Sequence, residues 1–307
     1  GTCMKNSFYY RMKMIVDFNI LLHGQMNRSR VIKRAVDLFL QKNLKYYKKK
    51  AKTMNKNVLI TAGSKNTGFE MCRTFAKNGY NVHLTSRSKT DAENASKRIK
   101  EEFPNIDAYG YSLELSSVAD IERAFDEIKQ NTETLDVFVG NAANLGIGLD
   151  TLTADEEGYD SVMNVNLKGT FFTSQYASKM MLKNGGSIVL LGSVQGCGAV
   201  RGRAVYGVSK AAINALSKYL SLDLAPYKIR ANCLIAGAIH TDRWENVAPA
   251  ELEKRHANYL TGREADMEEI ANAVYFLSSD LSGSITGTSL TVDSGVLVPI
   301  LPYNGGK

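Results

Sequence analysis

The segment that decides the fold runs from Ser187 to Pro226 and reads SIVLLGSVQGCGAVRGRAVYGVSKAAINALSKYLSLDLAP. Its first residues are apolar, partly β-branched and bounded by glycine, which predicts a short buried strand over 187–191. Helical periodicity begins at Tyr206 and ends at Pro226, because proline cannot continue a helix. The segment therefore predicts a strand, a loop opening at Ser193, and a helix.

On the predicted helix, Tyr206 and Lys210 are four residues apart and share one face. A phenol has an ordinary pKa of about 10, and a neighbouring ammonium lowers it by favouring the phenolate. Ser193 can hydrogen-bond a carbonyl oxygen and hold its carbon toward a hydride donor, while Tyr206 gives or takes the proton. The same Tyr–Lys spacing occurs three more times, but only Tyr206 has a serine at a strand end upstream.

From Asn57 onward the sequence alternates strand and helix patterns. Apolar runs predict strands over 58–60, 82–85, 108–113, 135–139, 187–191, 229–234 and 289–292. Helical patterns occupy 91–103, 118–129 and 154–182, and another ends at Gly79. Such repetition implies one doubly wound, Rossmann-type α/β domain over 57–307, with seven parallel strands, helices on both faces and ligands at the carboxyl ends of the strands.

A turn of small residues follows the first predicted strand and ends where a helix begins. The free amides and the positive dipole end of a helix start suit a pyrophosphate. The turn is poor in glycine, so its position after the first strand of the domain carries the prediction. The expected cofactor contacts are Gly63, Ser64, Lys65, Asn66, Thr67 and Gly68.

The choice of cofactor depends on the end of the second strand. An acidic residue there would bind ribose hydroxyls and repel a 2′-phosphate, but this chain has Ser86 and Arg87, with Lys65 in the phosphate turn. These residues favour NADP(H). NAD(H) stays open, because Arg87 can also lie flat against an adenine with no phosphate present.

Residues 57–295 resemble the short-chain dehydrogenase/reductase family. In addition to Ser193, Tyr206 and Lys210, the chain has Asn166 in a Val-Asn-Leu run, where the family holds a water of the proton relay through a bend in its helix. The resemblance implies a catalytic tetrad of these four residues. It also implies cofactor contacts at Glu114, Leu115, Asn141, Ala142, Gly237, Ile239 and Thr241, besides Tyr206 and Lys210. The chain departs from the family at Ala62 and Asn66, which replace glycines, at Glu114, which replaces an aspartate, at Gly140, which replaces an asparagine, and at Ala236, which replaces a proline.

Substrate recognition is expected on residues 194–205 and 240–262, and the second segment carries enough apolar side chains for a rigid hydrophobic ligand or for an amphipathic lid helix. The expected substrate contacts are Ser193, Gln195, Cys197, Tyr206 and Trp244. Over its whole length the chain resembles bacterial 20β-hydroxysteroid dehydrogenases, which implies a small apolar ketone or alcohol such as a cortisol-like steroid. The alternatives are a 3-oxoacyl thioester reductase and a nucleotide-sensing regulator that binds nucleic acid.

Residues 1–56 form a separate basic leader. They hold 14 Lys and Arg against two Asp, a net charge of +12, while the whole chain carries +7 and the remainder therefore −5. An apolar stripe along residues 32–47 predicts an amphipathic helix. The favoured interpretation is that this helix packs on its own subunit or on a sister subunit of a dimer or tetramer. Similarity of 28–40 to the second helix of ribbon-helix-helix repressors keeps nucleic acid or an anionic surface as the alternative.

Several classes of protein are disfavoured by what the sequence lacks. The four cysteines form no pair with metal-ligand spacing and the four histidines form no HExxH motif, so no metal is predicted. The most apolar part of the leader, 14–22, is too short to span a bilayer and lacks a signal-peptide pattern. A reduced, cytoplasmic setting without membrane attachment is expected.

Overall fold

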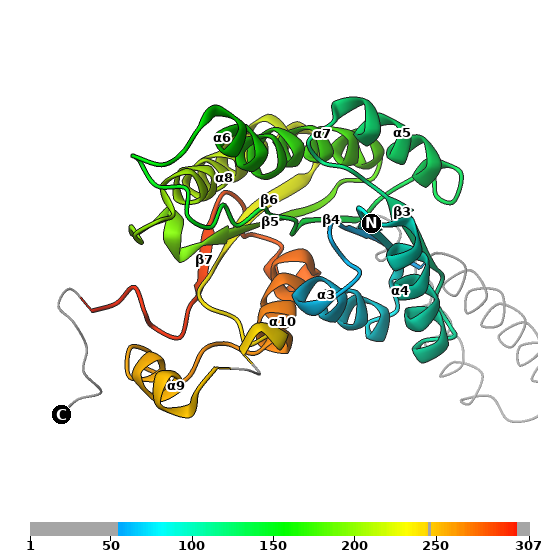
Figure 1. The fold of residues 1–307 in the computed structure, drawn as a ribbon. Helices are drawn as coiled ribbons and strands as arrows, with labels where there is room; N and C mark the ends of the chain where they lie inside the picture. Colours follow the sequence, from blue (N-terminus) through cyan, green and yellow to red (C-terminus); the bar gives the residue numbers. More distant parts are fainter. Residues whose placement is uncertain (1–54, 245–246, 300–307) are drawn as a thin grey trace, which may run out of the picture. The chain divides into compact units, whose positions relative to one another are not determined.

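A computed structural model describes residues 55–244 and 247–299 (Figure 1). Most of the leader predicted over 1–56 therefore lies outside the described residues. The sheet has seven parallel strands in the order β3-β2-β1-β4-β5-β6-β7, which confirms the predicted fold class. The strands are β1 (Asn57–Ile60), β2 (Asn81–Ser86), β3 (Ala108–Ser112), β4 (Val137–Gly140), β5 (Gly186–Ser193), β6 (Ile229–Ala236) and β7 (Ser289–Val292).

Helices cover both faces of the sheet (Figure 1). One face packs against α3 (Asn66–Lys77), α4 (Lys89–Glu102) and α10 (Met267–Ser278), and the other against α5 (Val118–Lys129), α7 (Thr170–Met181) and α8 (Ala204–Asp223). Successive side chains of a strand point to opposite faces of the sheet. In β1, Val58 and Ile60 therefore pack in the core on the α3 side, and Leu59 packs in the core on the α8 side. None of the helices in the described ranges has the length and apolar character needed to cross a membrane.

The predicted helical region over 154–182 is not one helix. It consists of α6 (Glu156–Met163), a π-helical turn η1 (Asn164–Gly169) and α7. A Cβ at Gly169 would lie 2.5 Å from the carbonyl oxygen of Leu115, so glycine permits a close approach between the π-helical turn and the end of β3. Within this turn the side chain of Asn166 is buried.

The amphipathic helix given as an alternative within 240–262 is present as α9 (Pro249–His256), whereas α10 was not predicted. The helix α10 begins with a capping box of Asp266 and Glu269, which is a recognisable start signal. The strand β5 extends two residues beyond the predicted apolar run and ends at Ser193. The prediction that Ser193 stands at the carboxyl end of a strand is therefore confirmed.

Candidate active site

Tyr206 and Lys210 lie on α8 with exposed fractions of 8% and 4%. The Nζ of Lys210 donates to the carbonyl oxygen of Leu191 in β5, at 2.6 Å, and lies 5.8 Å from the centre of the Tyr206 ring. Burial lowers the pKa of Lys210 to about 8. The strand end and the helix thus hold a desolvated lysine beside a phenol, which is an arrangement that favours the phenolate when the lysine is charged.

Ser193 lies half-buried at the end of β5, two residues beyond the carbonyl that binds Lys210. Its Oγ accepts a hydrogen bond from the backbone N–H of Gln195 at 3.2 Å, which caps the short helix η2 (Val194–Gly196). A hydroxyl that accepts one bond still has its own proton to donate. Ser193 can therefore bind a substrate carbonyl oxygen on the same side of the sheet as Tyr206.

Asn166 is buried in the π-helical turn, and both polar atoms of its side-chain amide are hydrogen-bonded. The Nδ2 donates to the carbonyl oxygen of Asn144 at 2.9 Å and to Ser209 Oγ at 3.0 Å, and Oδ1 accepts from the N–H of Asn144 at 2.7 Å. Ser209 Oγ donates in turn to the carbonyl oxygen of Tyr206 at 2.7 Å. The structure thus brings Asn166 to α8 through Ser209, a residue that the sequence analysis missed although it stands between Tyr206 and Lys210.

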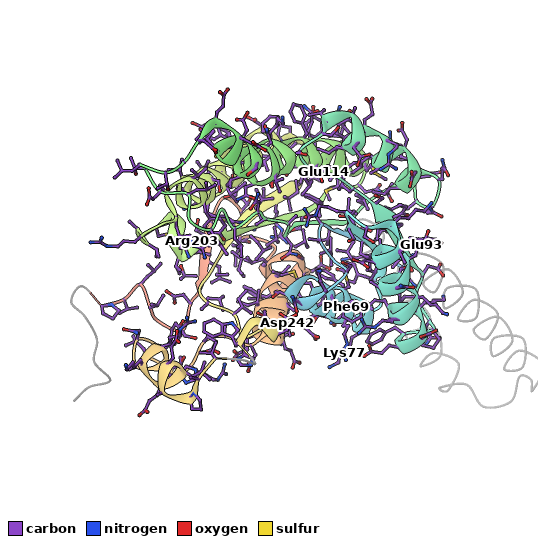
Figure 2. All side chains as sticks on the ribbon, viewed as in Figure 1. Phe69, Lys77, Glu93, Glu114, Arg203 and Asp242 are labelled. Atoms are coloured by element: carbon purple, nitrogen blue, oxygen red, sulfur yellow. The ribbon has the colours of Figure 1, made fainter. Side chains whose placement is uncertain are left out.

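The loop after β4 covers the tyrosine. Arg203 lies just ahead of α8 (Figure 2). Its Nη1 donates to the carbonyl oxygen of Leu145 at 2.7 Å, and its backbone pairs with Leu149. A Cβ built at Gly146 would lie 3.8 Å from the Cβ of Tyr206. The loop after β4 and the loop before α8 therefore form two adjoining walls of the site.

The phosphate turn has the left-handed backbone conformation that glycine adopts most easily, although two of its glycines are replaced. Ala62 and Asn66, which replace glycines, have φ angles of 51° and 50° in the left-handed region. The two remaining glycines are sterically required, because a Cβ would lie 2.8 Å from the Cβ of Leu84 at Gly63 and 2.1 Å from the carbonyl oxygen of Ala62 at Gly68. The turn therefore retains its close approach of the backbone to the start of α3.

The start of α3 fits an anionic group. The first turns of α4, α5 and α6 are capped by the side chains of Ser88, Ser117 and Asp155, but α3 has no side-chain cap and no acidic residue in its first turn. Its free N–H groups and positive dipole end therefore suit the pyrophosphate of a dinucleotide.

We expect Ala62→Gly to raise the free energy of unfolding by about 1 kcal/mol. A left-handed φ strains a residue with a Cβ, and the relief exceeds the extra chain entropy that glycine gives the unfolded state. Urea denaturation measures the change. Ala273→Gly, inside α10, is the matched control and should lower the free energy of unfolding by about 1 kcal/mol. A destabilising Ala62→Gly would contradict the assigned strain.

The other predicted cofactor residues lie at the carboxyl ends of the same strands. Asn141 donates from Nδ2 to the carbonyl oxygens of Thr61 and Ala62, at 3.0 and 3.3 Å, and so ties β4 to the phosphate turn. The Oε1 of Glu114 accepts from the N–H and the hydroxyl of Ser116. Ser86 is the last residue of β2, and Arg87, Leu115 and Ala142 follow β2, β3 and β4 at this edge. The side chain of Arg87 is exposed.

The loop after β6 holds the remaining candidates. The N–H of Gly237 donates to the carbonyl oxygen of Val292 at 2.9 Å, and Thr241 is buried at 4% exposure. Trp244 was expected to contact the substrate. Its indole Nε1 donates to the carbonyl oxygen of Ile239 at 2.7 Å, which fixes the ring against the loop after β6. Across the site, Cys197 is exposed and the buried Oε1 of Gln195 has no hydrogen-bond partner within the described ranges.

Residues 62–297 match the family model described as enoyl-(acyl carrier protein) reductase. This match, together with the tyrosine, lysine and serine near the carboxyl end of β5, decides the family. The chain belongs to the short-chain dehydrogenase/reductase family. A short-chain relative, 3alpha-hydroxysteroid dehydrogenase of Mediterraneibacter gnavus, is 30% identical over 249 residues, 78% of this chain and 96% of the relative.

Two further comparisons support the same family. The short-chain enzyme 3-oxoacyl-(acyl-carrier-protein) reductase FabG of Aquifex aeolicus is 31% identical over 248 residues, 80% of this chain and 98% of the relative. The crystal structure of acetoin dehydrogenase YohF from Salmonella typhimurium aligns with a TM-score of 0.72 and 25% identity, over 80% of this chain and 98% of that one. The oxidoreductase class is therefore shown for this short-chain dehydrogenase/reductase.

Proposed function

We propose that the protein interconverts a ketone and a secondary alcohol, with Tyr206 as the proton donor and acceptor. The observation that carries the proposal is the buried Lys210 ammonium 5.8 Å from the Tyr206 ring, next to Ser193 at the end of β5. When bound, NAD(P)H supplies the hydride. Ser193 donates to the carbonyl oxygen and orients it, and Tyr206 protonates that oxygen as negative charge develops on it.

Proton return to Tyr206 is proposed to pass through Lys210 and the π-helical turn. The side chain of Asn166 is committed to Asn144 and Ser209, so the group of Asn166 that remains for a relay water is its main-chain carbonyl. The side chain then acts by holding the π-helical turn against α8.

A steroid ketone, reduced as by a 20β-hydroxysteroid dehydrogenase, is the proposed substrate. Support comes from the hydroxysteroid dehydrogenase relative and from exposed apolar side chains on the loops that follow the strands. These loops adjoin one another, because Gly148 bonds to Gly202, Leu260 bonds to Ser294, and a Cβ at Gly198 would lie 3.8 Å from Leu297. The exposed residues, called the apolar rim here, are Ile147, Leu152, Val200, Leu260, Leu297 and Val298.

A 3-oxoacyl thioester is the second candidate substrate, because the FabG relative is as similar as the hydroxysteroid dehydrogenase. Both chemistries use the same proton donor and differ in the ligand that meets the apolar rim. Reduction assays with a cortisol-like steroid, a 3-oxoacyl thioester and a sugar ketone, each with NADH and NADPH, separate them. Turnover of the thioester alone would overturn the steroid assignment. A salt-sensitive gel shift without any turnover would favour the nucleic-acid-binding regulator.

NADP(H) is the proposed cofactor, and Arg87→Ala tests it. The Arg87 side chain is exposed after β2, where a charge-assisted contact to a 2′-phosphate has no counterpart in NAD(H). We expect the KM for NADPH to rise about tenfold or more, and the KM for NADH to change about twofold or less. Initial rates with both cofactors measure the two constants, and Lys97→Ala, which removes an exposed charge from α4, is the control. Equal changes for both cofactors would favour adenine stacking and NAD(H).

A homo-oligomer, dimer or tetramer, is proposed from the outer face of α8. Tyr219 and Leu222 are 67% and 72% exposed there and line a hollow of about 560 Å³ with Gly196 and Ala215. Large apolar side chains gathered on one exposed face are typical of a surface that a second chain covers. Light scattering of Leu222→Glu against the parent should show a smaller particle, and an unchanged mass would reject this face.

A further inference from the structure

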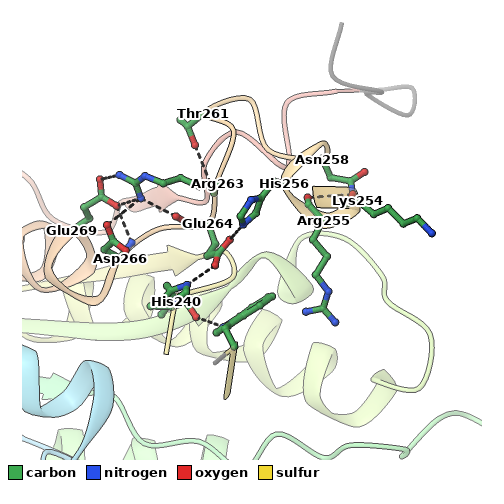
Figure 3. Close-up of polar contacts among 12 residues, drawn as sticks. His240, Lys254, Arg255, His256, Asn258, Thr261, Arg263, Glu264, Asp266 and Glu269 are labelled. Carbon is green, nitrogen blue, oxygen red and sulfur yellow. Dashed lines mark hydrogen bonds and ion pairs between the residues drawn. The ribbon is translucent and has the colours of Figure 1, made fainter. Parts of the chain in front are cut away.

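A buried carboxylate joins three segments beside the substrate region. Glu264 is 2% exposed, and its Oε1 lies 2.7 Å from Nδ1 of His240 while its Oε2 lies 2.8 Å from Nε2 of His256 (Figure 3). His240 belongs to the loop after β6, His256 ends α9, and Glu264 precedes α10. The proposed hydride and proton transfers use none of the three. We call them the His–Glu–His bridge.

The charge state of the bridge follows from its surroundings. Burial would raise the pKa of Glu264, but the hydrogen bond from His240, a backbone hydrogen bond and the interaction with His256 outweigh it, and the pKa lies below its ordinary value. An ionised carboxylate only accepts hydrogen bonds, so Nδ1 of His240 donates to Oε1 of Glu264. Nε2 of His256 and Oε2 of Glu264 lie at ion-pair distance without an aligned hydrogen bond, so charge attraction holds this side of the bridge. The other charged or titratable groups around Glu264 are Arg263, Arg255 and Tyr259.

The bridge holds segments that carry assigned site residues. His240 stands in the chain between Ile239 and Thr241, two of the expected cofactor contacts. Its N–H donates to the carbonyl oxygen of Ala265 at 2.8 Å. On the same loop Trp244 binds the Ile239 carbonyl oxygen, and the guanidinium of Arg255 from α9 lies 4.7 Å from the centre of the Trp244 indole. Beyond α9 the chain reaches Leu260 of the apolar rim. Loss of the bridge would therefore leave the Arg255–Trp244 contact and loosen the hold of α9 on the loop after β6.

We propose that Glu264 is a positioning residue that, through His240 and His256, holds α9 against the loop after β6 and so sets the affinity for the ketone. The inference rests on the proposed function, because that function places the substrate beneath the apolar rim. The bridge residues lie in the loop after β6, at the end of α9 and ahead of α10, whereas Tyr206 lies on α8. Without it, the substrate must order α9 on binding, which weakens the apparent affinity without changing the reacting groups.

The first experiment measures steady-state kinetics of the full chain with the best ketone at saturating cofactor. In Glu264→Gln the amide cannot accept from both histidines, and we expect KM to rise about tenfold with kcat within about twofold of the parent. His256→Gln should also raise KM. It serves as the second variant if Glu264→Gln folds poorly, because 35% of the His256 side chain is accessible and a substitution there disturbs the core less. Glu269→Gln, which weakens the exposed pair with Arg263 and keeps an amide oxygen to accept from the N–H of Asp266, is the control and should leave KM unchanged.

The second experiment needs no turnover. Trp244 is the single tryptophan of the chain, so its fluorescence reports on the junction of α9 and the loop after β6. We expect Glu264→Gln and His256→Gln to shift Trp244 emission to longer wavelength and to increase its quenching by acrylamide, and Glu269→Gln to do neither. Unchanged emission in both bridge variants, or a fall in kcat with KM unchanged, would overturn the proposal. If the parent reduces no ketone, the proposed function fails, and Trp244 emission alone decides whether the bridge holds α9.

Discussion

Tyr206→Phe should reduce ketone turnover by about 10²-fold or more and leave nicotinamide cofactor affinity nearly unchanged. The ring is 8% exposed and packed under the loop after β4, so phenylalanine fills the same space and keeps the fold. The variant loses only the hydroxyl that gives and takes the proton. Steady-state kinetics measure turnover, and fluorescence titration with the reduced cofactor measures affinity.

Tyr219→Phe is the matched control for this substitution. Tyr219 lies on the same helix, 13 residues beyond Tyr206, but is 67% exposed. Its variant should turn over like the parent. If Tyr206→Phe retained turnover within a few-fold of the parent, another group would have to supply the proton, and the assignment of the site would be wrong.

Lys210→Met should abolish turnover, weaken cofactor binding and stabilise the fold. Turnover falls by about 10²-fold or more because the ammonium that favours the Tyr206 phenolate is gone. Cofactor affinity falls because the same ammonium is placed to reach ribose hydroxyls. The free energy of unfolding rises, since burial lowers the pKa of Lys210 from 10.5 to about 8, which corresponds to about 3 kcal/mol of cost at neutral pH. Losing the bond to Leu191 leaves a net rise of about 1 kcal/mol or more.

The pH dependence of stability checks the sign of this effect. Between pH 8 and 10.5 the unfolded chain retains a proton on Lys210 that the folded chain releases, so the parent gains stability with rising pH in this window. The Met variant should lack that gain. Lys179→Met is the control, because Lys179 also lies over a tyrosine ring, that of Tyr176, but is exposed. A variant Lys210→Met that melts well below the parent would contradict the desolvation argument.

The fold was predictable because its signals are local. Apolar runs bounded by turns marked the strands, and their alternation with helices required a parallel sheet. The positions of Tyr206, Lys210 and Ser193 could be predicted from local sequence alone. Helix spacing puts Tyr206 and Lys210 on one face, and the end of an apolar run puts Ser193 at a strand end. The structure brings these residues to one edge of the sheet, as that argument predicts.

The missed features depend on contacts between distant segments. The family resemblance implied a bend in the helix at Asn166, but the periodicity of 154–182 does not show it. The π-helical turn depends on the approach of Gly169 to Leu115 and on the bonds of Asn166 to Asn144. The left-handed φ angles of Ala62 and Asn66 follow from the turn they occupy and not from their residue types. Likewise, nothing in the spacing of the His–Glu–His bridge indicates that its three members meet around one carboxylate.

The strand order has a consequence for how the chain acquires its structure during synthesis. β1 pairs with β2 on one side and with β4 on the other, and β4 is made only after β2 and β3 are complete. A nascent chain that ends before Val137 therefore carries a hydrophobic strand, Val58 to Ile60, with one hydrogen-bonding edge open. The central pairing of the sheet is thus a late and non-local event, which slows folding and exposes truncated chains to edge-to-edge aggregation.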